Sequence, residues 1–319
     1  MKRIVVILFL VAQMPCASAF IYDLTLLKGV NPHTGKKQLF LGCSDYHDKS
    51  HALTNAQLAA IEQKLAECNP RTTHVYTEDL SSRSSDGKSG CGRFAVKSQG
   101  GILGGLTGKC QSLGLAIDNI EYRFCRVAAI SPVLNNLEAN LFSFPSVSNT
   151  QIADLVNEIE QVMREVRSYN DGAALNNYYV RSLQEISQQL GELGLAHNSA
   201  LSVAQFLNSR VSVSDRMHML KLLLTFDSVL LDLKLVHRIV HSDSNVIAFT
   251  GGSHIERVAD VLEEILGFKQ MQPSKKQMVR EYDPQKCIGT TMVHGKYCVK
   301  PAAVVAKDFD STFKAFNRQ

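Results

Sequence analysis

The densest group of side chains that could do chemistry lies at residues 42–51, with the sequence GCSDYHDKSH. It contains two histidines, two aspartates, a cysteine and a tyrosine. Neutral imidazoles and carboxylates are good ligands for zinc, manganese or iron. The segment therefore predicts a divalent metal site with His47 or Asp45 as ligand, and Asp48 could orient His47. The alternative is a surface loop whose polar residues cap the next helix.

A second candidate is the segment Gly251-Gly252-Ser253-His254, late in the chain. Glycines let the backbone turn sharply and approach a ligand closely. His254 would then lie in the first turn of a helix, where the helix dipole favours the neutral, metal-binding imidazole. The segment predicts that His254 is a metal ligand and that Gly251 and Gly252 contact the bound group. The alternative is a tight turn with a solvent-exposed histidine.

The third candidate is Glu78, which follows the strand-like segment at residues 73–77. A carboxylate at the end of a strand could bind a metal ion or act as a general base. We predict one of these roles for Glu78 and favour it over its neighbour Asp79. The alternatives are a helix N-cap and a salt bridge.

These residues need elements that position them. Residues 38–42 predict a short strand that enters a polar loop, and residues 73–77 predict a second strand. Between them Thr54 and Gln57 form a capping-box pattern that opens a helix, which ends before Pro70. A strand–helix–strand unit of this kind implies parallel strands.

The rest of the chain alternates strand, helix and loop patterns. A Gly/Ser-rich loop over 81–108, a short helix near 102–113, a strand over 116–122, irregular chain over 131–148, a strand over 245–249 and a helix over 258–266 are predicted. Sites in open parallel sheets lie beyond the carboxyl ends of the strands. The three candidates should therefore meet at one edge of a sheet.

Between about 150 and 240 the apolar residues recur with a helical period. The predicted fold is α/β, with one open mixed or parallel sheet and an inserted helical subdomain. The predicted boundaries are a signal peptide at 1–19, α/β chain at 20–149 and 215–319, and a helical insertion or cap at 150–214. The tail after residue 269 is expected to be loop-like, with one strand near 297–305.

The predicted helix over 215–240 places His237 and His241 one turn apart. It lacks the glutamate of an H-E-x-x-H motif, so packed or exposed side chains are favoured over a metal site. On the same helix, Asp232 and Arg238 suggest either a buried polar pair that reaches toward the site or an ordinary salt bridge.

The N-terminus has the pattern of a cleavable secretory signal. Lys2 and Arg3 precede an apolar run over 4–11, and Ala17-Ser18-Ala19 is a small-x-small cleavage site. The run is too short to span a bilayer, and no other membrane span is expected. The mature protein would begin near Phe20 and act in the periplasm or outside the cell. The formal charge of +4 is too small to indicate nucleic acid as a partner.

Seven of the eight cysteines lie beyond the predicted signal. An oxidising compartment favours disulfides. Cys287 and Cys298 flank a polar loop and are the first predicted pair, and Cys91 with Cys110 is the second. An odd number leaves at least one free thiol, which we expect to be Cys43. The alternative is that all seven are reduced.

The order of these motifs resembles the TraB/PrgY/GumN–Tiki superfamily, which includes ChaN-like and EreA-like proteins. That family has a strand with a Gly-x-x-His loop, a strand that ends in Glu, a helical region and a second Gly-x-x-His. Residues 42–47, Glu78 and residues 251–254 stand in this order. The first motif departs from the family pattern, because Asp45 stands at its histidine position. Either His47 is the ligand, or Asp45 takes that role, or the site has lost its chemistry.

The resemblance implies a metal-dependent peptidase, whereas ChaN-like members resemble haem binders. The leading hypothesis is a secreted, metal-dependent, peptidase-like hydrolase that acts on a peptide or protein. His47 or Asp45 would hold a divalent ion together with His254, and Glu78 would be a ligand or the general base. The alternative is a non-catalytic secreted protein that binds haem, a peptide or a host partner in the same cleft.

Overall fold

The computed structural model describes residues 18–48, 51–78, 102–120, 149–273, 278–281, 291–293, 297–301 and 306–318. At several ends of these segments it describes the backbone alone. The loop predicted over 81–108 before the helix, the irregular chain predicted over 131–148, and most of the predicted signal peptide lie outside the described residues.

A mixed sheet of six strands forms the centre of the molecule. Its strands are β1 (Ser18–Val30), β2 (Lys37–Asp48), β3 (Thr73–Thr77), β4 (Ala116–Asn119), β5 (Asn245–Gly251) and β6 (Lys269–Gln270). Their order is β4-β3-β5-β2-β1-β6. Strands β2, β3, β4 and β5 are parallel, whereas β1 runs antiparallel to β2 and β6. A small antiparallel sheet contains β7 (Met278–Glu281), β8 (Thr291–Val293) and β9 (Tyr297–Pro301).

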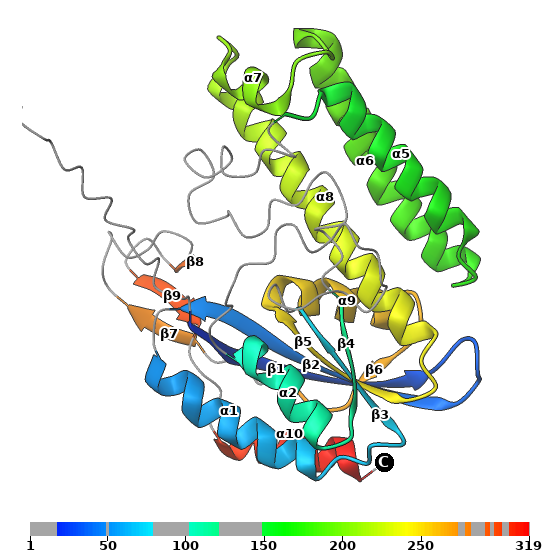
Figure 1. Ribbon diagram of the computed structural model, residues 1–319, viewed down its shortest axis with the longest axis vertical. Coiled ribbons are helices and arrows are strands. Elements are labelled where there is room, and N and C mark those ends of the chain that lie inside the picture. Colours follow the sequence, from blue (N-terminus) through cyan, green and yellow to red (C-terminus); the bar gives the residue numbers. More distant parts are fainter. Residues whose placement is uncertain are drawn as a thin grey trace, which may run out of the picture.

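Helices cover both faces of the central sheet, so the predicted α/β class with an open mixed sheet is confirmed (Figure 1). They are α1 (His51–Ala66), α2 (Ile102–Ser112), α5 (Ile152–Ser168), α6 (Ala173–His197), α7 (Val203–Asn208), α8 (Val213–Val240), α9 (Gly252–Glu264) and α10 (Ala306–Asn317). In the described part of the chain, none of these helices is long and apolar enough to cross a membrane.

Strand periodicity divides the apolar side chains between two cores. Phe40 of β2 and Ala248 of β5 face a core made with α8 and α9, while Leu41 and Ile247 face a core made with α1, α2 and α10. Successive side chains of a strand point to opposite faces, so two apolar neighbours can serve two cores. The central strands are therefore apolar on both sides, and their polar residues gather at the strand ends.

The helical block is part of the larger core. The buried faces of α5 and α6 pack with α8, and the same apolar cluster continues through α9 to the sheet. Figure 1 shows the α5–α6 hairpin extending beside α8, away from the sheet. Because α8 reaches from this hairpin to the sheet, it can carry side chains that contact both.

The prediction of a polar loop after residue 42 is wrong, because β2 continues as a strand through Asp48. The reason is β1, which the sequence analysis did not predict and which pairs with β2 along its length. The helix predicted to start at Thr54 starts at His51. Gln57 is not a capping residue, because its side chain bonds the Ile21 backbone, with Nε2 2.9 Å from O and Oε1 2.8 Å from N.

The prediction of a loop-like tail with a single strand is also wrong, because the tail contains β7 and β8 as well as α10. Phe309, Phe313 and Phe316 of that helix are buried in the core under α1. Their spacing of four and three residues is the helical period. The strand predicted near 297–305 corresponds to β9.

Three free thiols, of Cys43, Cys68 and Cys110, are buried in the core that α1 and α2 form with the sheet. Burial raises the pKa of Cys43 well above its usual value, that of Cys68 to about 11 and that of Cys110 to about 12. The free state expected of Cys43 is confirmed. The predicted pair of Cys91 with Cys110 does not fit a free, buried Cys110. Cys91 and the pairing of Cys287 lie outside the described residues.

Candidate functional site

The carboxyl ends of β2, β3 and β5 lie together at one edge of the sheet, as the sequence analysis predicts. Asp45 of β2 pairs in register with Gly251 of β5, and Thr77 of β3 pairs with Phe249. Glu78 continues this ladder, since its backbone N–H donates to Phe249 O at 3.0 Å. Parallel pairing thus brings Glu78 and the start of α9 to the same place.

The Glu78 side chain is buried and held by the end of β5. Its Oε2 accepts hydrogen bonds from the Thr250 hydroxyl and from the Gly251 backbone N–H, the latter at 2.8 Å. Buried carboxylates are stable only with such partners. The carboxylate is therefore fixed in position against the first turn of α9.

His254 lies in the first turn of α9, where the sequence predicts it, and is buried rather than solvent-exposed. Its Nδ1 is 2.6 Å from Oδ1 of Asp232, a buried residue of α8. A carboxylate accepts hydrogen bonds, so Nδ1 carries the proton and donates it to Asp232. Nε2 is then the ring nitrogen that can accept a proton or bind a metal ion.

Gly251 leaves space between the two side chains. A Cβ at this position would lie 3.4 Å from His254 Cδ2 and 3.5 Å from Glu78 Oε2. Both side chains therefore flank the spot that a larger residue would fill. Gly252 has a different role, because a Cβ there would lie 1.9 Å from the Tyr22 hydroxyl. Close packing on β1 explains this second glycine without a bound ligand.

Arg257 completes the cluster around Asp232. Its Nε bonds Asp232 Oδ2, and its Nη2 lies 3.3 Å from Oδ1 and 3.0 Å from His254 Nδ1. Since Nδ1 already donates to Asp232, the guanidinium contact with the ring is one of packing. The predicted pairing of Asp232 with Arg238 is wrong: Asp232 pairs with Arg257 and His254. Positions six residues apart on a helix point in different directions.

The remaining predicted ligands lie on β2. Asp45 is buried and, two residues after Cys43, shares the face of β2 that α1 covers. Glu78 and His254 lie instead with Thr250 and α9, so the structure brings these two together and does not place Asp45 between them. His47 pairs with Ala19 in the β1–β2 ladder, but its side chain lies outside the described residues. The four-residue ligand set stays a prediction.

A second group of side chains has the spacing of metal ligands. Within the described part of the chain, one trio of His, Cys, Asp or Glu residues has its ligand atoms all within 4.8 Å of one another, and it consists of His33, Asp171 and His241. Sequence analysis noted His241 and its neighbour His237 but missed Asp171 and His33. No local pattern links these residues, because they come from three separate segments.

Comparison of the chain with protein-family models, with curated proteins and with solved structures found no match. The resemblance to the TraB/PrgY/GumN–Tiki superfamily therefore rests on its short motifs alone.

Proposed function

We propose that the protein is a secreted, metal-dependent, peptidase-like hydrolase whose site lies at the carboxyl edge of β2, β3 and β5. The observation that carries this proposal is the convergence of His254 and Glu78 at Gly251, with Asp232 holding the imidazole. An imidazole oriented by a buried carboxylate, next to a second carboxylate, is the set of groups that metal-assisted hydrolysis uses.

Each residue has one role in the proposal. Asp232 fixes the tautomer of His254, so that Nε2 faces the reacting group as a metal ligand. Glu78, held by Thr250 and Gly251, takes up the proton of the attacking water. His47, whose side chain lies outside the described residues, would be the further ligand. A divalent ion such as zinc, manganese or iron would supply a polarised water of lowered pKa.

Secretion is part of the proposal and rests on the N-terminal pattern. Cleavage after Ala19 would remove only the first two residues of β1, those opposite Asp48 and His47. The rest of β1, from Phe20 to Val30, would keep its pairing with β2. The mature chain would thus keep the strand that holds β2 in place.

The proposal is tested by comparing His254→Ala and Glu78→Gln with His218→Ala, a change on α8 outside the site. Purified mature protein is incubated with a mixed peptide library, and cleavage is followed by mass spectrometry while bound metal is measured by elemental analysis. Loss of general acid–base catalysis predicts a rate reduced by roughly 10²- to 10⁴-fold for Glu78→Gln. His254→Ala should also lose bound metal. Equal cleavage by all three variants would overturn the proposal.

One observation favours the alternative of a non-catalytic binding protein. The Arg257 guanidinium lies 3.0 Å from His254 Nδ1, and although it pairs with Asp232 its side chain is partly exposed, so its positive charge opposes a second cation nearby. A haem carboxylate or a peptide carboxylate would bind its exposed side. This second function predicts no cleavage of the library, together with haem or peptide binding that Arg257→Gln weakens.

A further inference from the structure

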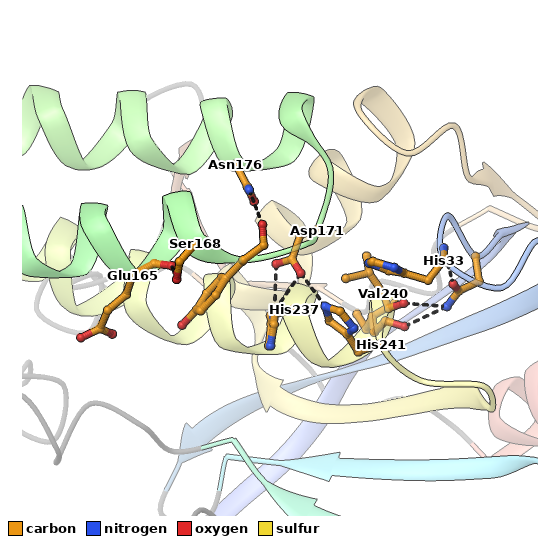
Figure 2. Close-up of polar contacts among 11 residues, drawn as sticks. His33, Glu165, Ser168, Asp171, Asn176, His237, Val240 and His241 are labelled. Atoms are coloured by element: carbon orange, nitrogen blue, oxygen red, sulfur yellow. Dashed lines mark hydrogen bonds and ion pairs between the residues drawn. The ribbon is translucent and has the colours of Figure 1, made fainter.

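We propose that His33, Asp171 and His241 form a binding site for a divalent transition-metal ion, separate from the site at the sheet edge and independent of the proposed hydrolase function. In Figure 2, dashed lines join Asp171 to His241 and His237, and His33 lies beside His241; one ligand atom of each of His33, Asp171 and His241 lies within 4.8 Å of the others. His33 lies in the turn between β1 and β2, Asp171 in the turn between α5 and α6, and His241 just after α8. Two imidazoles and one carboxylate are a common ligand set for zinc and iron.

Asp171 is the centre of the cluster. Its side chain is 1% exposed, with Oδ1 2.7 Å from His241 Nε2 and Oδ2 2.8 Å from His237 Nδ1. Its two oxygens therefore each face an imidazole nitrogen, in a position that is closed to solvent on the carboxylate side.

The surroundings of Asp171 suit a cation. Among the described residues, its side-chain partners are the imidazoles of His237 and His241. Burying a carboxylate is costly unless it is paired. A divalent ion bound by the carboxylate and by imidazole lone pairs would offset that cost. It also explains why three histidines gather at one aspartate.

The ligand atoms are close enough to close around an ion. All lie within 4.8 Å of one another, and a tetrahedral zinc site with bonds of about 2.0 Å needs ligand atoms roughly 3.3 Å apart. The ion would replace the direct hydrogen bond between His241 and Asp171. His33 stacks on His241 with ring centroids 4.3 Å apart and is exposed, so its ring has room to turn. His237 is a positioning residue that holds the second oxygen of Asp171.

Backbone contacts already hold His33 beside the end of α8. Asn31 Oδ1 accepts from the His33 backbone N–H at 2.9 Å, while Asn31 Nδ2 donates to Val240 O and Ser242 O, each at 3.0 Å. These carbonyls lie at the end of the helix, where intrahelical partners are lacking. Gln38 Nε2 adds a bond of 3.0 Å to the same Ser242 carbonyl. The turn that carries His33 is thus fixed to the helix that carries His241.

The turn that carries Asp171 is held as well. Asn176 Nδ2 donates to Tyr169 O at 2.7 Å, and Gly172 adopts a φ of 97°, which favours glycine (Figure 2 shows the first contact). The Tyr169 ring packs on His237 with centroids 4.4 Å apart. A bound ion would therefore join the α5–α6 hairpin to the β1–β2 turn. Its exposed side leaves a coordination position for water.

The test is a titration of metal-stripped, intact protein with ZnCl₂, followed by calorimetry and by the melting temperature. Wild type should bind zinc at this site and melt at a higher temperature with zinc than without. His33→Ala, a change at an exposed residue that leaves the core intact, should weaken that binding by more than about 100-fold, because even residues that only orient a ligand are worth 10- to 100-fold. His241→Ala should do the same.

Two controls separate this site from others. His218→Ala should bind zinc like wild type. His254→Ala should keep the zinc-dependent rise in melting temperature, because His254 belongs to the sheet-edge site. MgCl₂ should not replace zinc, since magnesium prefers oxygen ligands. Zinc affinity unchanged in both His33→Ala and His241→Ala would overturn the proposal. So would a melting temperature that responds to pH but not to zinc.

Discussion

Two buried aspartates near α8, Asp232 and Asp171, each hold histidines, but their charges are balanced differently. Asp232 receives the Arg257 guanidinium as well as His254. Asp171 receives the imidazoles of His237 and His241. A guanidinium carries a fixed positive charge, whereas an imidazole nitrogen can bind either a proton or a metal ion. The first aspartate is thus paired with a permanent charge, and the second with groups that can also be metal ligands.

The two clusters also differ in what they connect. Asp232 and His254 join two helices that are packed together on the same face of the sheet. Asp171, His33 and His241 join turns from the helical hairpin, the β1–β2 hairpin and the end of α8. The first cluster orients one side chain toward a site. The second would bind three parts of the chain together, so it should affect stability more strongly when an ion is present.

The largest effect is expected from Asp232→Ala. Removal of the carboxylate leaves the His254 ring and part of the Arg257 guanidinium without a partner. Breaking a buried pair costs about 3–5 kcal/mol, and the partial exposure of Arg257 reduces this to about 2–4 kcal/mol. The free energy of unfolding in urea measures it. A loss of less than about 1 kcal/mol would show that the clusters do not differ as described.

Asp171→Asn tests whether the negative charge of Asp171, and not its shape, makes the second cluster bind zinc. The amide keeps the shape of the side chain but not the negative charge, so the zinc-dependent rise in melting temperature should vanish. Without zinc, the variant should lose about 1–3 kcal/mol of unfolding free energy, as expected for impaired buried hydrogen bonds. Asp232→Asn is the matched control and should keep the zinc response. A zinc response lost equally in both variants would contradict the assignment.

Asn31→Ala tests the supports of the second cluster. It frees the turn of His33 and leaves the Val240 and Ser242 carbonyls without this donor. Zinc affinity should fall by about 10- to 100-fold, as for other residues that orient metal ligands. Peptide cleavage should be unchanged, because the sheet-edge site lies elsewhere. Calorimetry measures zinc affinity and the cleavage assay measures peptide hydrolysis, so the two effects are read independently. A fall in cleavage without a fall in zinc affinity would contradict the assignment of Asn31 to the second cluster.

The smallest effect concerns the thiols on the opposite face of the sheet. Cys68 and Cys110, with pKa values raised to about 11 and about 12, should resist alkylation at pH 8 in the folded protein and react after unfolding. Because the folded pKa values are raised, the stability that these thiols contribute is present below their unfolded pKa, near 9, and is lost as the pH rises toward 11 and 12. Zinc should leave the protection of these two thiols from alkylation unchanged. Faster alkylation in the presence of zinc would show that zinc binding disturbs both faces of the sheet.

Much of the sheet and most helices were predictable from local patterns. The helical period of α5, α6 and α8 follows from apolar spacing, and the apolar run of β5 leads directly to the glycines before His254. The spacing of Phe309, Phe313 and Phe316 in α10 is likewise a helical period that is visible in the sequence. Such patterns depend on the geometry of a single element, so neighbouring residues are enough to reveal them.

The polar run after Gly42 shows the limit of local patterns. Its composition is that of a loop, yet it forms a strand because β1 supplies a hydrogen-bonding partner along its length. Gln57 likewise has the position of a capping residue, but it bonds Ile21 across the core. In both cases a partner more than ten residues away decides the conformation, and no pattern within the segment identifies that partner.

The sequence by itself determined that Glu78 follows a strand, that His254 begins a helix, and that His237 and His241 lie one turn apart. Each of these follows from the period of one element. Only the tertiary structure decided that Asp232 pairs with His254 and Arg257, and that Asp171 and His33 meet His241. The turns that carry Asp171 and His33 reach α8 through packing and backbone hydrogen bonds over long sequence distances. Contacts of this kind depend on the whole fold, because each partner's position is set by a different part of the core.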